Sequence, residues 1–439
     1  MRVLKFILRV AIAASLVAPG VFAETPKPAS VVAAKPVVRV ASFQNLPQGL
    51  SETSVRAHRS VIAQEQHIRA EVVDSAREVF AKMPVAKKDF KKAPAVDVGA
   101  FGTAMHTILK DQVTGYTLQV RKNGALVYNL IWNWAQTPAD ANKGWTEDTR
   151  MHVASVSKYL TAVGLVKLLD DKGISYDAKI AGYLPAHWSR GNNIDKITFR
   201  HLMTHRSGFS SDGSASSYAF MKGKVAAGVS GVGSYDYENM NFGLGRILIS
   251  IINGDIAKNA TFIADPALND QAWDAVTLYH FKNYMQSKVF TPSGVANVGF
   301  APPDGAKAFA YKFPDDNQDG WNSGDLASMA GGAGFRLSIK ELLSVMNTVR
   351  RQNTVLASEK AQEMLDNFFG IDQAIDTPAG KIYNKNGSWG TGDGKVEQCV
   401  AYFMPGGMEV AVFVNSPIGA SGFSLRGLVK DAYLNSLKE

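Results

Sequence analysis

The order of strand-like and helix-like segments is the feature that most constrains the fold of this chain. Residues 115–128 alternate apolar and polar around Asn123-Gly124, a dipeptide typical of a β-hairpin turn. Residues 396–403 and 409–414 are strand-like segments on either side of a Pro-Gly-Gly turn. The block between them, roughly 160–345, has mainly helical patterns, and 425–437 is amphipathic. We therefore expect an α+β fold, with an antiparallel sheet flanked by helices plus a mainly helical subdomain.

The N-terminal region predicts export rather than catalysis. Residues 1–23 combine three basic residues, an apolar stretch and a Val-Phe-Ala ending, as a secretory signal peptide does. Residues 24–98 predict a linker and an accessory helix, and 99–439 form the main domain. We expect secretion across the inner membrane into the periplasm, with membrane contact only through an uncleaved signal or a weak surface attraction.

The charge balance argues against a nucleic-acid-binding protein, and the cysteine content argues against a protein stabilised by disulfides. Of the formal net charge of +8, residues 1–23 carry +3 and residues 24–98 carry +4, so the main domain is almost neutral. This balance predicts no nucleic-acid partner. Cys399 is the only cysteine, so no intramolecular disulfide can form, and we expect it to be a buried strand residue. Stability must therefore come from the hydrophobic core.

The tetrapeptide Ser155-Val156-Ser157-Lys158 precedes an apolar helical run. If Ser155 opens that helix, Lys158 lies one turn later on the same face, within reach of the serine oxygen. A hydroxyl nucleophile beside a lysine is the arrangement of serine-lysine acylation sites. Taken alone, the pattern is also that of a helix cap followed by a solvated lysine.

Two later motifs decide between these interpretations. Tyr237-Glu238-Asn239 lies among glycines, and Lys385-Asn386-Gly387-Ser388 begins the C-terminal strands. With Ser155 and Lys158 they follow the order S-x-x-K, Y-x-N, K-x-G. From about residue 100 onward the chain resembles the serine hydrolase family of class C β-lactamases, D-alanyl-D-alanine carboxypeptidases and related carboxylesterases. The resemblance implies the β-lactamase/transpeptidase fold.

The resemblance also implies a role for each motif residue. Ser155 would be the acylated nucleophile, and either Lys158 or Tyr237 would accept its proton. Asn239 would bind the substrate carbonyl and steady Lys158. Lys385 would orient the tyrosine and attract a substrate carboxylate. The amides of Ser155 and Ser388 would form the oxyanion hole, with Ser388 on an edge strand after Gly387.

The third motif departs from the family at one position. Asn386 stands where the β-lactamases and many peptidases have Thr. Asn is larger and differently shaped, which weakens the expectation of tight β-lactam or peptide carboxylate recognition. We expect Trp389 to narrow the pocket further.

Several other patterns imitate functional sites. Lys122-Asn123-Gly124 repeats the third motif, but its place in a hairpin favours a turn. His201 and His205 have the spacing of a metal pair, yet the Glu of a zinc-protease motif is absent, so packing and capping roles are expected. Residues 315–320 match only half of a calcium loop, which favours a surface turn. We predict no metal and no cofactor.

The functional hypothesis is an exported serine hydrolase that forms an acyl-enzyme on Ser155. Its partner is a small-molecule or peptide substrate, with peptidoglycan among the sources. D-Ala-D-Ala peptides and β-lactams rank slightly above small esters, because Lys385 favours a carboxylate. A non-catalytic penicillin-recognising envelope module is the alternative from another class.

Overall fold

The structure is a computed structural model that describes residues 90, 92–210, 216–314, 319–419 and 424–439. The expected signal peptide, the linker and the accessory helix lie outside the described residues. Four positions of the half calcium loop, 315–318, also lie outside them. None of the helices in the described ranges combines the length and apolar character that a membrane span needs.

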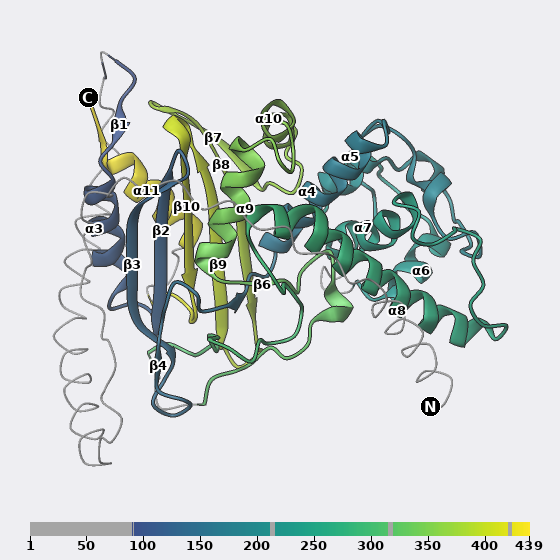
Figure 1. Cartoon of the computed structure of the whole chain (residues 1–439), viewed down its shortest axis with the longest axis horizontal. Helices are drawn as coiled ribbons and strands as arrows, with labels where there is room; N and C mark the ends of the chain where they lie inside the picture. The colour runs from purple at the N-terminus through teal and green to yellow at the C-terminus, as the bar shows by residue number, and fades with distance from the viewer. Residues whose placement is uncertain (1–89, 91, 211–215, 315–318, 420–423) are drawn as a thin grey trace, which may run out of the picture.

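Within the described residues, seven strands form one antiparallel sheet in the order β4-β3-β2-β10-β9-β8-β7 (Figure 1). Strands from both ends of the chain meet at its centre, where β2 pairs with β10. The predicted hairpin is confirmed, because β2 and β3 are joined at residues 123 and 124. The strand bounds are β2 Gly115–Lys122, β3 Ala125–Gln136, β4 Lys143–Gly144, β7 Gln373–Thr377, β8 Gly380–Gly390, β9 Val396–Met404 and β10 Met408–Val414.

Helices cover both faces of this sheet. On one face, α3 (Val98–Leu109) and α11 (Leu425–Asn435) pack on the apolar side chains of β2, β9 and β10. On the other face lie α4 (Val156–Asp171), α9 (Ile339–Arg351) and α10 (Ser358–Asp366), as Figure 1 shows. The central strands are buried on both sides, so β10 is apolar at nearly every position. The predicted α+β class is confirmed.

A helical region extends from one end of the sheet beyond α4 (Figure 1). Its helices are α5 Phe199–Met203, α6 Tyr218–Ala227, α7 Asn239–Ile252 and α8 Pro266–Met285. Helices α4 and α7 are buried along almost their whole length, because they pack on each other between the sheet and the outer helices. A short ladder of β5 (Met151–His152) with β6 (Arg336–Leu337) joins this region to the sheet side.

The C-terminus differs slightly from its sequence prediction. We expected one helix over 425–437, but α11 ends at Asn435 and Leu437–Lys438 forms β11. This strand pairs with β1, Ala95–Val96, which precedes α3. The amphipathic pattern continues through Leu437 because that side chain is buried in the same core as the helix.

Candidate active site

Ser155 lies at a sharp turn between β5 and α4. Ala154 adopts φ 44°, a left-handed conformation that costs a residue with a side chain about 1 kcal/mol. The turn makes Ser155 the N-cap residue of α4, so its amide lies at the positive end of the helix dipole. The structure therefore places the predicted nucleophile where backbone amides can stabilise a developing anion.

Lys158 lies one helical turn after Ser155 and is fully buried. Its Nζ contacts three oxygen atoms: Ser155 Oγ at 3.0 Å, Asn239 Oδ1 at 2.5 Å and the Gly332 carbonyl at 2.8 Å. Burial lowers the pKa of Lys158 to about 8, and the second ammonium at Lys385 also lowers it. The side chain is thus fixed against the nucleophile with a pKa close to neutrality.

These three contacts fit both protonation states of Lys158. An ammonium has three N–H donors and would donate one to each oxygen. A neutral amine has two donors, which would serve Asn239 and Gly332, and its lone pair would accept the Ser155 hydroxyl proton. The geometry therefore suits Lys158 either as a fixed cation or as the base.

Tyr237 lies two residues before the start of α7, and Asn239 is the first residue of that helix. The ring centroid of Tyr237 is 4.8 Å from Lys158 Nζ and 5.1 Å from Lys385 Nζ. Burial alone would raise the pKa of the Tyr237 hydroxyl. The two lysines, together with hydrogen bonding from Lys158 and Ser155, outweigh burial and hold that pKa below its usual value. Tyr237 is therefore also placed and tuned to accept a proton from Ser155.

Lys385 lies on β8 and is almost completely buried. Its Nζ is 3.5 Å from Tyr237 Oη and donates to Asp372 Oδ1 at 2.5 Å. Burial lowers the pKa of Lys385, but Tyr237 and Asp372 outweigh that effect and raise it. Sequence reasoning missed Asp372, because this residue belongs to no motif and lies in the loop before β7.

The β8 segment after Lys385 lies directly beside the start of α4. A Cβ added to Gly387 would be 2.5 Å from the Val153 carbonyl oxygen and 3.2 Å from the Ser155 nitrogen. Only glycine allows this approach, which brings the peptide that precedes Ser388 close to the nucleophile. The two amides expected to form the oxyanion hole therefore lie in adjacent segments.

The expectation that Ser388 lies on an edge strand needs a correction. The outermost strand is β7, which pairs with β8. That pairing ends at Gln373 and Asn384, so the part of β8 that carries Ser388 extends beyond β7. Ser388 is exposed there. β8 is therefore an internal strand, but the part of it that carries Ser388 pairs only with β9 and not with β7.

A buried histidine, His152, supports the turn that carries Ser155, and sequence reasoning did not find it. His152 on β5 pairs with Glu397 on β9 at 2.7 Å, and its Nε2 accepts the Gly334 amide proton at 3.1 Å. Trp389 packs edge-on against the His152 ring, with centroids 5.8 Å apart. The hydrogen bonds of His152 thus link β5, the strand before Ser155, to β9 and to the loop that holds Gly332.

The patterns that imitated other sites have structural roles. The turn at Lys122-Asn123-Gly124 joins β2 to β3, with φ 50° at Asn123 and 83° at Gly124. His201 forms a capping box with Thr198, the N-cap residue of α5, and His205 is buried against Tyr237, as the packing and capping prediction required. Cys399 is buried on β9, where burial raises the pKa of its thiol well above the usual value.

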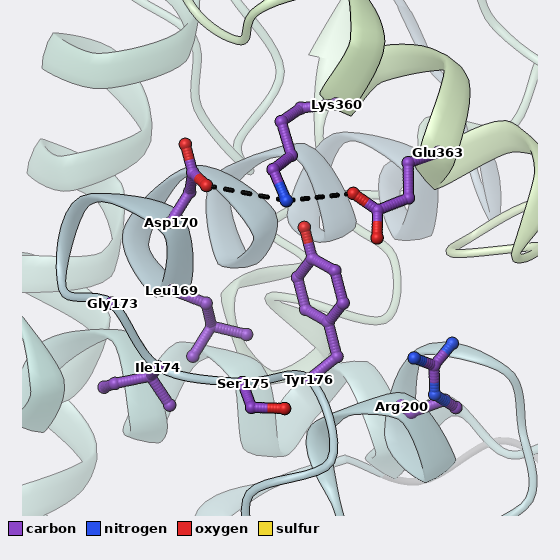
Figure 2. A pocket seen from close by; sticks show the side chains of 9 residues that line it. All are labelled: Leu169, Asp170, Gly173, Ile174, Ser175, Tyr176, Arg200, Lys360 and Glu363. Carbon is purple, nitrogen blue, oxygen red and sulfur yellow. Dashed lines mark hydrogen bonds and ion pairs between the residues drawn. The ribbon is translucent and has the colours of Figure 1, made fainter.

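A separate polar hollow of about 440 Å³ lies at the far end of α4 (Figure 2). Its charged groups neutralise one another, because Lys360 pairs with Glu363 at 2.9 Å and with Asp170 at 3.7 Å. Helix α4 rises 1.5 Å per residue, which puts this hollow about 20 Å from Ser155. It is not part of the serine-lysine cluster.

Comparisons with known proteins agree with this geometry. Residues 89–254 match the family model described as Beta-lactamase. A penicillin-binding protein homologue from Pyrococcus abyssi is 18% identical, with a TM-score of 0.58 and 76% of each chain covered. A β-lactamase/D-alanine carboxypeptidase from Yersinia pestis is 16% identical, with a TM-score of 0.55, and the match covers 77% of this chain and 99% of that one. A D-amino acid amidase from Ochrobactrum anthropi SV3 is 17% identical, with a TM-score of 0.56 and coverage of 76% and 98%.

At such identities the solved structures show the fold, and the family model adds the sequence signature of the first half of the domain. The resemblance inferred from the three motifs is thereby confirmed. The chain has the fold of class C β-lactamases and of a penicillin-binding protein homologue, and its residues 89–254 match the Beta-lactamase family model.

Proposed function

We propose that the protein is a serine hydrolase that cleaves small amides or esters through an acyl-enzyme on Ser155. The observation that carries the proposal is the convergence on Ser155 of Lys158 and Tyr237, with Lys385 3.5 Å from the tyrosine hydroxyl. A serine hydroxyl is a weak nucleophile until a neighbouring group takes its proton. Two such groups with lowered pKa values lie beside this one.

The reaction follows from these positions. Tyr237 or Lys158 takes the hydroxyl proton as Ser155 Oγ attacks the substrate carbonyl. The amides of Ser155 and Ser388 donate to the resulting oxyanion. The leaving alcohol or amine takes the proton back when its bond to the acyl carbon breaks. Water then attacks the acyl-serine ester by the same route, which releases the acid and restores the hydroxyl.

Three substrate classes fit this chemistry. D-Ala-D-Ala peptides and β-lactams bear a carboxylate near the scissile bond, whereas small esters and amides need not. The structural relatives include a β-lactamase/D-alanine carboxypeptidase and a D-amino acid amidase, so enzymes for both groups of substrate occur on this fold. If residues 1–23 direct export, as we propose, periplasmic peptidoglycan peptides would be within reach of the site.

Side-by-side turnover tests the proposal. Wild type and Ser155→Ala would be given a chromogenic cephalosporin, a nitrophenyl ester and a D-Ala-D-Ala peptide, and then a fluorescent fluorophosphonate and a fluorescent penicillin. We expect turnover of at least one substrate and covalent labelling, both abolished by Ser155→Ala. Penicillin binding without turnover of any substrate would indicate the non-catalytic module instead. The absence of turnover and of all labelling would reject the hydrolase.

A further inference from the structure

The ammonium group of Lys385 is already paired with a carboxylate of its own chain. Asp372 Oδ1 lies 2.5 Å from Lys385 Nζ, a charge-assisted hydrogen bond. Lys385 is 1% exposed and Asp372 is 16% exposed, so the pair lies mostly within the protein with the carboxylate on the solvent side. The lysine expected to attract a substrate carboxylate therefore has an internal partner.

Asp372 is held in this position by several contacts. Its second carboxylate oxygen, Oδ2, accepts the Asn386 amide proton at 2.9 Å, and its own amide donates to the Asn384 carbonyl at 2.9 Å. Arg426 on α11 lies 3.7 Å from Oδ2. Because the carboxylate bridges the side chain of Lys385 and the next backbone amide of β8, it cannot leave without breaking both contacts.

This arrangement changes which substrates the site accepts. A substrate carboxylate directed at Lys385 would meet the negative charge of Asp372 and would have to displace it. Juxtaposed like charges are a strong means of rejecting a ligand. Arg426 offsets part of this repulsion, but it already forms an ion pair with the same Asp372 oxygen.

Tyr235 lies near enough to interact electrostatically with Asp372 and Lys385, and its ring offers an uncharged aromatic surface. Tyr235 is 60% exposed, and its ring packs edge-on against His205 at 6.0 Å, beside the Tyr237 ring. An exposed aromatic ring near Lys385 and Asp372 suits an apolar or aryl group better than a carboxylate. The Asp372 carboxylate and the Tyr235 ring thus both favour substrates with neutral groups near Lys385.

We infer that Asp372 is a specificity-determining residue, which makes the site select esters or amides with no carboxylate near the scissile bond. The inference rests on the proposed acyl-enzyme chemistry and names its substrate class. It reverses the order expected from sequence, where Lys385 favoured acidic peptides and β-lactams. The backbone amide of Asn386 supports this role, because it donates to Asp372 Oδ2 and so helps to hold the carboxylate beside Lys385.

A matched pair of chromogenic esters tests this inference. Nitrophenyl butyrate and carboxynitrophenyl butyrate share an acyl group, and the second carries a carboxylate on the leaving group. Rates would be normalised to hydroxide-catalysed hydrolysis of each ester. We expect wild type to prefer the neutral ester, and Asp372→Asn to raise the relative kcat/KM for the carboxylate ester about tenfold, because one like charge is removed.

The control is Asp376→Asn, a carboxylate on β7 that is 90% exposed and 3.9 Å from Lys381. This variant should leave the ratio between the two esters unchanged. Wild-type preference for the carboxylate ester would overturn the inference without any variant. The inference would also be overturned if Asp372→Asn left the ratio of kcat/KM for the two esters unchanged, for example by lowering both values equally. If wild type cleaves neither ester and also takes no fluorophosphonate label, the hydrolase proposal itself is rejected.

Discussion

The imidazole ring of His205 stacks on the phenol ring of Tyr237, with centroids 4.2 Å apart and planes 28° from parallel. Burial, together with Lys158 and Lys385, holds the pKa of His205 well below its usual value. The ring is therefore neutral, and its Nδ1 accepts the Glu238 amide proton at 3.1 Å. It supports the tyrosine without adding a third cation beside the two lysines.

Removing this support is expected to lower turnover more than binding. His205→Ala leaves the Tyr237 ring free to move, and small displacements of a reacting group cost up to about 100-fold in rate. His205→Phe keeps the stacked surface and should retain more activity than the alanine variant. The measurement is kcat and KM for a neutral ester, with His201→Ala as the control. Wild-type kcat in His205→Ala would contradict the positioning role.

The pH dependence of acylation tests whether the group that takes the Ser155 proton has a lowered pKa. The pKa of Lys158 is lowered to about 8, so kcat/KM should rise as the pH increases through that value, whether Lys158 or its coupled partner Tyr237 loses the proton. A profile that stays flat between about pH 6 and pH 9 would contradict this assignment.

Tyr237→Phe separates the two possibilities. The charge of an ionised Tyr237 raises the pKa of Lys158, so its removal lowers that pKa further. If Lys158 is the base, the variant keeps activity and its rising limb moves to lower pH. If Tyr237 is the base, activity falls by about 1000-fold at every pH. Either result identifies the group that takes the Ser155 proton.

Gly387 is expected to tolerate no side chain. In Gly387→Ala the new Cβ would lie 2.5 Å from the Val153 carbonyl oxygen and 3.0 Å from Cys399 Sγ, so β8 must move away from Ser155. Loss of one oxyanion donor lowers kcat by about 100-fold. Gly392→Ala is the control, because its Cβ would have no atom within 4 Å. Near-normal kcat in Gly387→Ala would remove the Ser388 amide from the mechanism.

The pair of His152 and Glu397 is expected to stabilise the domain. Both side chains are buried, and Glu397→Ala leaves the His152 Nδ1 without its partner. The free energy of unfolding should fall by about 1–3 kcal/mol, the usual effect of a buried polar group that loses its hydrogen bond. Urea denaturation measures this, with the exposed Glu359→Ala as the comparison. Equal stabilities of the two variants would show that the pair contributes little.

Much of the fold and the central cluster could be predicted, because their signals are local or recur in a fixed order. Asn123-Gly124 specifies its turn through positive φ angles, and Ser155 precedes an unbroken apolar helix. Asp372 could not be predicted in the same way, since its contacts depend on how β7 and β8 pair. His152 and Glu397 are 245 residues apart, and no periodicity connects them.

The identity of the acylated residue tests the central claim most directly. Wild-type protein labelled with a fluorophosphonate would be digested, and the peptide that contains both Ser155 and Ser157 sequenced by tandem mass spectrometry. The Ser157 hydroxyl is buried and accepts the Phe335 amide proton at 3.3 Å, so it cannot react without rearrangement. We predict a single adduct on Ser155, absent from Ser155→Ala. An adduct on Ser157 or elsewhere, or none on active wild type, would contradict the proposed mechanism.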